Sequence, residues 1–269
     1  MVANGQMSRE DYVRHLRKTE LSLGHLIHEV NKTKTVLGYR LGARTVPDLT
    51  FYTQADMWTR FAPTEHLIKP VYSLDNFPVL YAHDFLRNPP PDLDNSKKGI
   101  PLTLRTVIDW PVKLPGQSKL TTLSIPVSTQ PDDYFAHQQV GKKLKPFFIE
   151  HDEGTETILP SLANQQRPDF FSSTSLLQKL LIYLAYWRAY RHVSELGIQS
   201  FEVIIKTRTP ERADRIIEQL APILLARKAP PNFVRVTDDE TAARYNHNPY
   251  HPDYIHLNLK GDYVHLLDV

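Results

Sequence analysis

Cysteine is absent from this chain of 269 residues, whereas histidine occurs 12 times. The absence excludes disulfides, thiolate catalysis and cysteine-ligated zinc, and it suits a reducing compartment. No apolar run approaches the roughly 20 residues that a membrane-spanning helix needs, and the first six residues have no apolar signal-peptide core. We therefore expect a cytoplasmic protein without membrane association.

A surplus of charge of one sign is also absent. The chain has 32 Lys and Arg against 30 Asp and Glu, a formal net charge of +2. This balance lacks the strongly basic signature of many nucleic-acid-binding domains, so any contact with DNA must come from local patches. The length is sufficient for one substantial core. We predict a single domain over 1–269, with an N-terminal helix in 1–40, a core sheet and helix in 41–210, and a C-terminal helix and strands in 211–269.

Hydrophobic patterning predicts an α/β fold. Short apolar or alternating runs predict strands at Leu49–Tyr52, Leu102–Ile108, Leu120–Val127, Asp133–Ala136, Phe147–Glu150, Phe201–Lys206 and Phe233–Val236. Helical patterns occupy about 8–37, a short stretch around Trp58, about 172–196, and the segment after the Thr209-Pro210 start signal. A loop is expected at 88–99 and a hairpin around Gly261. This order predicts a mixed central sheet flanked by helices.

Three acids at strand ends form the leading candidate site: Asp132, Glu150 and Asp152. Side chains alternate along a strand, so Glu150 and Asp152 are expected on one face and His151 on the other. If the strands that carry Asp132 and Glu150 are neighbours, the acids converge. Clustered carboxylates are tolerated when a proton or a cation lies between them, and their hard oxygens select Mg²⁺ or Mn²⁺. Alternatively, each is an ordinary surface acid at the end of a strand.

The helix that follows these strands adds cationic candidates. Lys179 lies at helical spacing with Tyr183 and is a candidate to stabilise charge on a phosphoryl group. The alternative is that Lys179 only extends to solvent from the edge of an apolar face. Arg188 and Arg191 are candidate contacts to DNA phosphates. The tail histidines His247, His251 and His256 lie in or beside a segment interrupted by proline, which favours a loop over a zinc site.

Three segments together carry a family pattern. Pro131–Phe135 begins with Pro-Asp, Phe147–Glu156 reads Phe-Phe-x-Glu-x-Asp-x-Gly-Thr-Glu, and Lys179–Tyr183 follows on a predicted helix. The pattern resembles the replication-relaxation family of bacterial plasmid and mobile-element proteins, over roughly residues 20–210. That family is similar to the PD-(D/E)xK nuclease superfamily, so the resemblance implies a restriction-endonuclease-like core.

The resemblance also implies roles for single residues. Asp132 and Glu150 would bind the metal ion, and Lys179 would supply the catalytic lysine from the helix. Asp152 stands where the superfamily usually has lysine, a departure that bears on catalysis.

We therefore expect a metal-dependent DNA endonuclease of PD-(D/E)xK type. Asp132 and Glu150 would hold Mg²⁺ or Mn²⁺, Asp152 would be a third metal ligand or the base that positions water, and Lys179 would stabilise the charge on the phosphoryl group. An alternative is a nuclease-like factor that binds DNA or protein in plasmid replication, relaxation or conjugation without cutting. A third possibility is a subunit whose protein partner supplies the DNA targeting.

Overall fold

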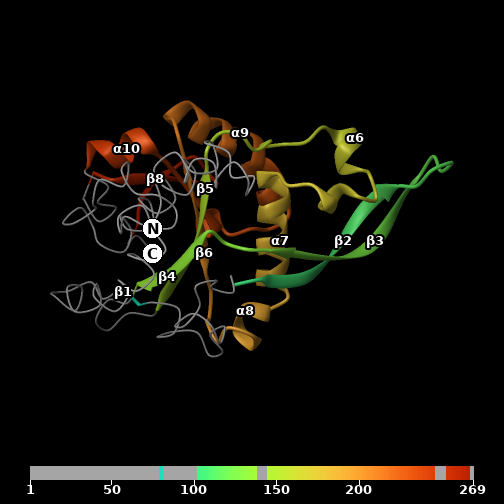
Figure 1. The fold of residues 1–269 in the computed structure, drawn as a ribbon, viewed down its shortest axis with the longest axis horizontal. Coiled ribbons are helices and arrows are strands. Elements are labelled where there is room, and N and C mark those ends of the chain that lie inside the picture. Colours follow the sequence, from blue (N-terminus) through green and yellow to red (C-terminus); the bar gives the residue numbers. More distant parts are fainter. Residues whose placement is uncertain (1–78, 81–101, 138–143, 246–252, 267–269) are drawn as a thin grey trace, which may run out of the picture.

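The computed structural model describes residues 79–80, 102–137, 144–245 and 253–266, which are drawn as ribbons in Figure 1. Several predicted features lie outside these residues: the N-terminal helix, the strand at Leu49–Tyr52, the helix around Trp58, the loop at 88–99, and the histidines His247 and His251.

A mixed sheet of seven strands forms the centre of the described structure, as the sequence predicts. Its order is β1-β4-β5-β6-β7-β8-β9. Strands β5, β6 and β7 are parallel, and the other neighbours are antiparallel. The strands are β1 (Val79–Leu80), β4 (Asp133–His137), β5 (Lys145–Asp152), β6 (Glu202–Thr207), β7 (Val234–Asp238), β8 (Ile255–Asn258) and β9 (Tyr263–His265).

Helices connect the parallel strands, as crossovers between parallel strands require. The segment between β5 and β6 contains α6 (Leu162–Gln165), the 3₁₀ turn Phe170–Ser172, α7 (Leu176–Arg188) and α8 (Arg191–Ser194). The segment between β6 and β7 contains α9 (Pro210–Ala226) and the 3₁₀ turn Pro231–Phe233, and α10 (Asp239–Arg244) follows β7. Figure 1 shows α7 and α9 lying along the sheet.

The helix starts follow local capping chemistry. Thr209 accepts the backbone N–H of Arg212 at 3.3 Å, and Pro210 occupies the first helical position, which confirms the predicted start of α9. Helix α7 is capped by Ser175, two or three residues later than predicted. The prediction that α7 continues to about Leu196 is wrong, because Tyr190 adopts a left-handed conformation (φ 55°) that ends one helix and precedes another.

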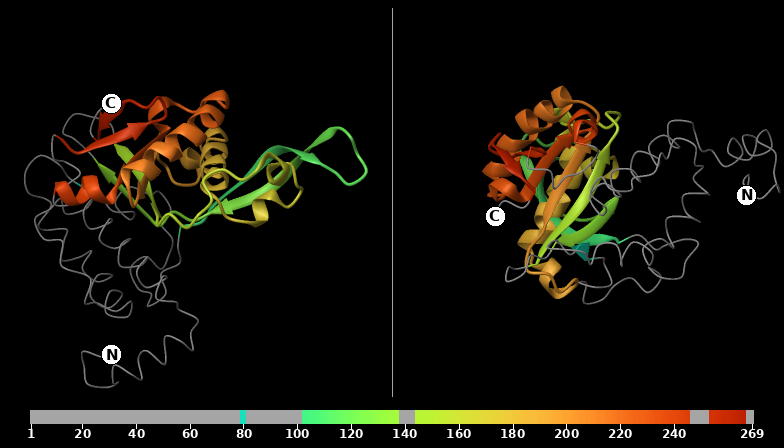
Figure 2. Two further views of the ribbon diagram at one scale, coloured as in Figure 1. Left: turned by 90° about the horizontal axis from the view of Figure 1, so that it is seen from above. Right: turned by 90° about the vertical axis from the view of Figure 1, so that its left-hand side faces the viewer.

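Two long strands form a separate ribbon, β2 (Leu104–Lys113) with β3 (Leu120–Thr129). The predicted hairpin is confirmed, and Gly116 provides the left-handed conformation in its turn. One face of the ribbon packs on α7 and on the chain around Phe170, where the Trp110 ring stacks at 5.3 Å. The tip projects away from the sheet and helices in both Figure 1 and Figure 2.

Two prolines lie within the ribbon, Pro111 opposite Thr122 and Pro126 opposite Val107. The backbone N–H of Lys113 points out of the ribbon, toward the carbonyl of Gln166 at 2.7 Å. Residues two apart in an antiparallel strand share this direction. Both prolines therefore occupy positions at which a backbone donor would face away from the partner strand.

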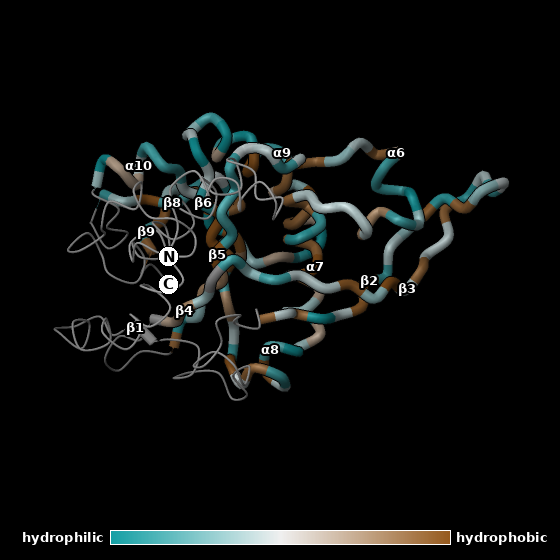
Figure 3. The backbone as a smooth tube through the Cα atoms, viewed as in Figure 1, coloured by the Kyte–Doolittle hydropathy of each residue, from teal (hydrophilic) through white to brown (hydrophobic). Residues whose placement is uncertain are grey.

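The main core lies between the sheet and the layer formed by α7, α9 and the ribbon. Phe148 is its centre: its ring is fully buried, 4.7 Å from Phe201 and 5.8 Å from Tyr183. Figure 3 shows apolar residues concentrated where α7 and α9 meet the sheet. A smaller apolar cluster covers the opposite face of the central strands and contains Phe147 and Ile149. Alternate residues of β5 thus serve two different cores.

We predict that Phe148→Ala lowers the free energy of unfolding by about 3–5 kcal/mol. Removal of the buried ring leaves a cavity that the surrounding side chains do not fill. Urea unfolding followed by circular dichroism measures this change. Val107→Ala is the matched control, since Val107 is 51% exposed on the ribbon, and we expect a change within about 0.5 kcal/mol. Equal losses in the two variants would contradict the assignment of the core.

Candidate functional site

A buried carboxylate, that of Glu150, is the centre of the candidate site. Glu150 lies in β5 and is 1% exposed. Its Oε2 accepts a hydrogen bond from Lys179 Nζ at 3.0 Å, and its Oε1 accepts one from the Tyr183 hydroxyl. Both donors come from α7, where the four-residue spacing places them on one face. The helix therefore delivers a cation and a hydroxyl to the same acid.

A second acid shares the lysine. Glu156 Oε1 lies 2.9 Å from Lys179 Nζ, so the ammonium group bridges two carboxylates. Burial alone would lower the pKa of Lys179, but the charges of Glu150 and Glu156 outweigh it and raise that pKa above its ordinary value. Lys179 is therefore a fixed positive charge at the site. The other oxygen, Glu156 Oε2, is buried and has no hydrogen-bond partner within the described residues.

Asp132 directly precedes β4, the strand next to the one that carries Glu150. Its backbone N–H donates to the Ile149 carbonyl at 2.9 Å, and its Oδ2 accepts the backbone N–H of His151 at 2.8 Å. These bonds continue the β4–β5 pairing to the end of the sheet. The predicted adjacency of the two strands is confirmed.

Burial raises the pKa of Glu150 to about 7. Lys179 opposes this rise, while the negative charge of Asp132 adds to it. The carboxylate would therefore change protonation near neutral pH in the absence of a further cation. Carboxyl groups with a pKa raised by burial are common at functional sites. Structural ion pairs also shift pKa values.

Asp152 has a different set of partners. Arg212 donates to it twice, from Nε at 2.5 Å and from Nη2 at 3.0 Å, and the Thr207 hydroxyl donates at 2.9 Å. The backbone N–H of Gly154 adds a bond at 3.1 Å, in a turn where Gly154 has φ 81°. As predicted, Asp152 is on the same sheet face as Glu150. Its observed contacts anchor the start of α9 to β5.

Of the two predicted DNA contacts, Arg188 is the last residue of α7 and Arg191 is the first residue of α8. Arg188 is nine residues from Lys179, about 14 Å along a helix. Arg188 Nη1 lies 3.5 Å from the Arg227 carbonyl, and Arg191 Nη1 forms an ion pair with Glu195 at 2.7 Å. The structure therefore separates these arginines from the Glu150 cluster, and DNA binding by them stays a prediction.

Three residues of the site have no role assigned from the sequence: Tyr183, Glu156 and Arg212. Tyr183 was named only for its spacing from Lys179, Glu156 only as the end of the family pattern, and Arg212 not at all. Tyr183 was detectable from its four-residue spacing from Lys179. The pairing of Arg212 with Asp152 depends on the crossing of α9 over β5, which no local pattern specifies.

The donor chemistry fits a divalent cation in part. Within the described residues no group of three or more His, Asp and Glu side chains is arranged to hold a metal ion. Asp132 and Glu150 offer two sets of hard oxygen ligands, and Mg²⁺ commonly binds through one or two carboxylates and several waters. The unpartnered buried oxygen of Glu156 adds negative potential nearby. Asp132 and Glu150 are therefore the two carboxylates that could hold such an ion.

Comparisons of the chain with protein-family models, with curated proteins and with solved structures gave no match. No helix in the described part of the chain is long and apolar enough to cross a membrane.

We predict that Arg212→Met costs roughly 3 kcal/mol of unfolding free energy, because it leaves the buried Asp152 carboxylate without its ion partner. Urea unfolding of Arg212→Met, Asp152→Asn and the double variant measures the coupling. We expect the double variant to lose less than the sum of the single losses. Additive losses would show that the pair does not anchor α9.

We also predict a specific pH dependence for Glu150. Its folded pKa of about 7 lies above the ordinary value of 4.5, so the folded protein holds an extra proton between these values. Wild type should therefore lose roughly 3 kcal/mol of stability relative to Glu150→Gln as pH rises from about 4.5 to 7. Urea unfolding of both proteins at pH 5 and pH 8, with a chelator present, measures this difference. A difference that does not change with pH would contradict the raised pKa.

Proposed function

We propose that this protein is a metal-dependent nuclease that hydrolyses phosphodiester bonds in DNA. One observation carries the proposal: Asp132, which directly precedes β4, adds its negative charge to the environment of the buried Glu150 of β5, beside a lysine that contacts two acids. Two carboxylates and a nearby cation are the groups that metal-assisted phosphodiester hydrolysis needs. A mixed sheet with helices also agrees with the restriction-endonuclease-like core that the sequence resemblance implies.

Each residue has a role that follows from its contacts. Asp132 and Glu150 would hold Mg²⁺ or Mn²⁺, which when bound lowers the pKa of water and neutralises phosphoryl charge. Tyr183 fixes the orientation of the Glu150 carboxylate by donating to Oε1. Lys179 keeps its proton and offers positive charge to a phosphate that approaches Glu150.

Glu156 is the second acid that contacts the ammonium group of Lys179. In this proposal Asp152 holds the start of α9 in place through its bonds with Arg212, Thr207 and Gly154.

A second candidate function is supported by the same ion pairs. Lys179 already neutralises Glu150, and Arg212 neutralises Asp152, so the cluster has protein partners for its charges without a metal ion. Such a site suits an accessory factor that binds DNA or protein in plasmid replication, relaxation or conjugation without cutting. In either case a protein partner that supplies DNA targeting would suit the nearly neutral net charge.

We predict that purified protein nicks supercoiled plasmid DNA in Mg²⁺ or Mn²⁺. Glu150→Gln and Asp132→Asn should each lower the rate by at least about 100-fold, because each removes an anionic ligand without a large change in shape. Gel analysis of nicked and linear products over time measures the rate.

The matched controls are Glu218→Gln and Asp214→Asn, which remove exposed acids of α9. These variants should cleave as wild type does. DNA binding without cleavage, unchanged by metal ions and by Glu150→Gln, would favour the accessory factor. Cleavage that survives both site substitutions would show that the assigned acids are not the metal ligands.

A further inference from the structure

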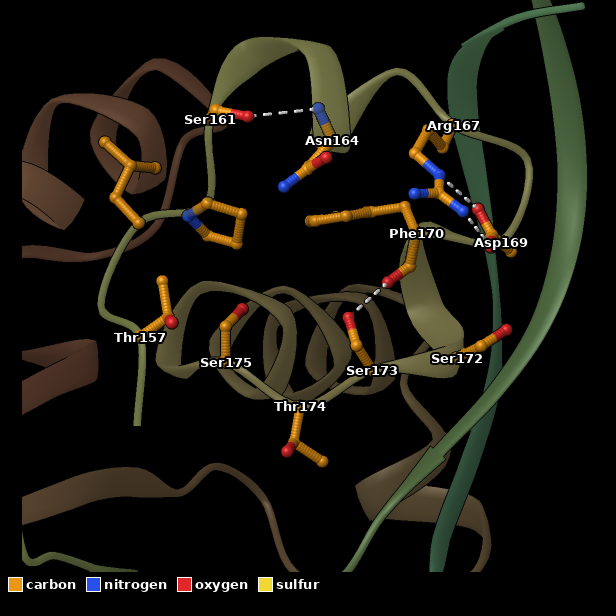
Figure 4. A pocket seen from close by; sticks show the side chains of 12 residues that line it. Thr157, Ser161, Asn164, Arg167, Asp169, Phe170, Ser172, Ser173, Thr174 and Ser175 are labelled. Atoms are coloured by element: carbon orange, nitrogen blue, oxygen red, sulfur yellow. Dashed lines mark hydrogen bonds and ion pairs between the residues drawn. The ribbon is translucent and has the colours of Figure 1, made fainter. Parts of the chain in front are cut away.

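A polar cavity of about 590 Å³ lies between α6, the start of α7 and the chain that joins β5 to α6. Its volume is in the range of sites that hold small molecules. Figure 4 shows the Asn164 amide pointing into the hollow from α6, the Phe170 ring projecting from one side, and Thr157 and Ser175 on the opposite wall. Leu159 and Pro160 add apolar surface to the lining.

The cavity offers hydrogen-bonding groups that the protein does not use. The side chains of Thr157 and Asn164 are exposed and take part in no hydrogen bond within the described residues. Ser161 Oγ accepts the backbone N–H of Asn164 at 3.3 Å, so its hydroxyl proton is available to an acceptor. An amide and two hydroxyls above an apolar wall match a ligand with a polar edge and a flat, apolar face.

The start of α7 does not make this cavity an anion site. Its first backbone donors are already occupied: Leu176 N–H by the Thr157 carbonyl, Leu177 N–H by the Ile158 carbonyl, and Gln178 N–H by Ser175 Oγ. The one guanidinium of the lining, that of Arg167, donates twice to Asp169, at 2.9 and 2.7 Å. The lining is therefore electrically neutral, and it suits an uncharged ligand.

The cavity lies next to the acid cluster. Thr157 directly follows Glu156, whose carboxylate contacts Lys179. Ser175 caps α7 four residues before Lys179, about 6 Å along the helix axis. A chain that lies with one phosphate at Lys179 thus has an adjacent hollow for an uncharged group.

We propose that this cavity binds the uncharged nucleoside part of an unpaired nucleotide, next to the phosphodiester that the Asp132–Glu150 site would cleave. A base inside a duplex is stacked and paired, so only a single-stranded or unstacked nucleotide can enter such a hollow. Bases held outside the stack are bound by hydrogen bonds to their edges and by contact with apolar side chains, which are the groups found here. The proposal rests on the proposed nuclease function and adds that the substrate has an unpaired strand at the site.

The test measures binding of a short labelled single strand and of the matching duplex by fluorescence anisotropy, with a chelator present to prevent cleavage. Asn164→Trp fills the cavity from an exposed helix position. The matched control is Leu162→Trp, which adds the same ring to α6 at a residue that is 67% exposed and outside the lining. We expect Asn164→Trp to weaken single-strand binding about tenfold and to leave duplex binding unchanged, and Leu162→Trp to change neither.

A milder variant and competing small molecules complete the test. Asn164→Ala should weaken single-strand binding in the same direction as Asn164→Trp, without added bulk. Free thymidine or adenosine at millimolar concentration should compete with the strand, whereas glucose should not. Equal competition by glucose, no effect of Asn164→Trp, or no single-strand binding by wild type would each overturn the proposal.

The two proposals fail separately. Glu150→Gln should abolish cleavage and leave single-strand binding intact. If wild type never cleaves but Asn164→Trp still weakens single-strand binding, the nuclease function is wrong and the nucleoside site stands. If cleavage requires Glu150 but Asn164→Trp has no effect on single-strand binding, the nucleoside site is wrong and the nuclease function stands.

Discussion

Burial of the Glu150 carboxylate is the constraint on which the arrangement around it depends. An isolated buried carboxylate is costly unless it is paired or protonated. Here the cost is offset by Lys179 and Tyr183 on the same helix, and the raised pKa shows that the compensation is incomplete near neutral pH. The position of α7 over β5 is therefore tied to one acid.

The charge pairs of this region divide into two kinds. Asp152 and Arg212 form a closed pair with two bonds between them, both side chains largely buried. Glu150, Lys179 and Glu156 form an open chain in which one ammonium group serves two acids and one carboxylate oxygen has no donor within the described residues. A closed pair stabilises the position of α9, whereas an open chain can rearrange when a charged ligand arrives. This contrast is why the nuclease proposal uses Glu150 and leaves Asp152 in a structural role.

Much of the fold around the site was predictable, because local signals of known physical origin mark it. Thr209 and Pro210 start α9 as predicted, the apolar run at Phe147–Glu150 is a central strand, and the hairpin turn lies at Gly116. The break at Tyr190 was not predictable in the same way, because no glycine or proline marks its left-handed conformation. The neighbouring positions of Asp132 and Glu150 followed from the adjacency of β4 and β5. The pairing of Asp152 with Arg212 joins residues 60 positions apart and depends on helix placement, which periodicity does not encode.

The prolines of the β2–β3 ribbon have a consequence for the protein in crowded solution. The edge of a β-ribbon presents unpaired backbone N–H and C=O groups. A strand of another molecule can pair with them, and many β-proteins aggregate in this way. Pro126 removes a donor from the outer edge of β3, and Pro111 does the same for β2, where Gln166 already accepts the Lys113 donor. A strand of another molecule that paired with β2 or β3 would lack one backbone hydrogen bond at the proline. Both missing donors therefore disfavour the addition of a further strand to this projection.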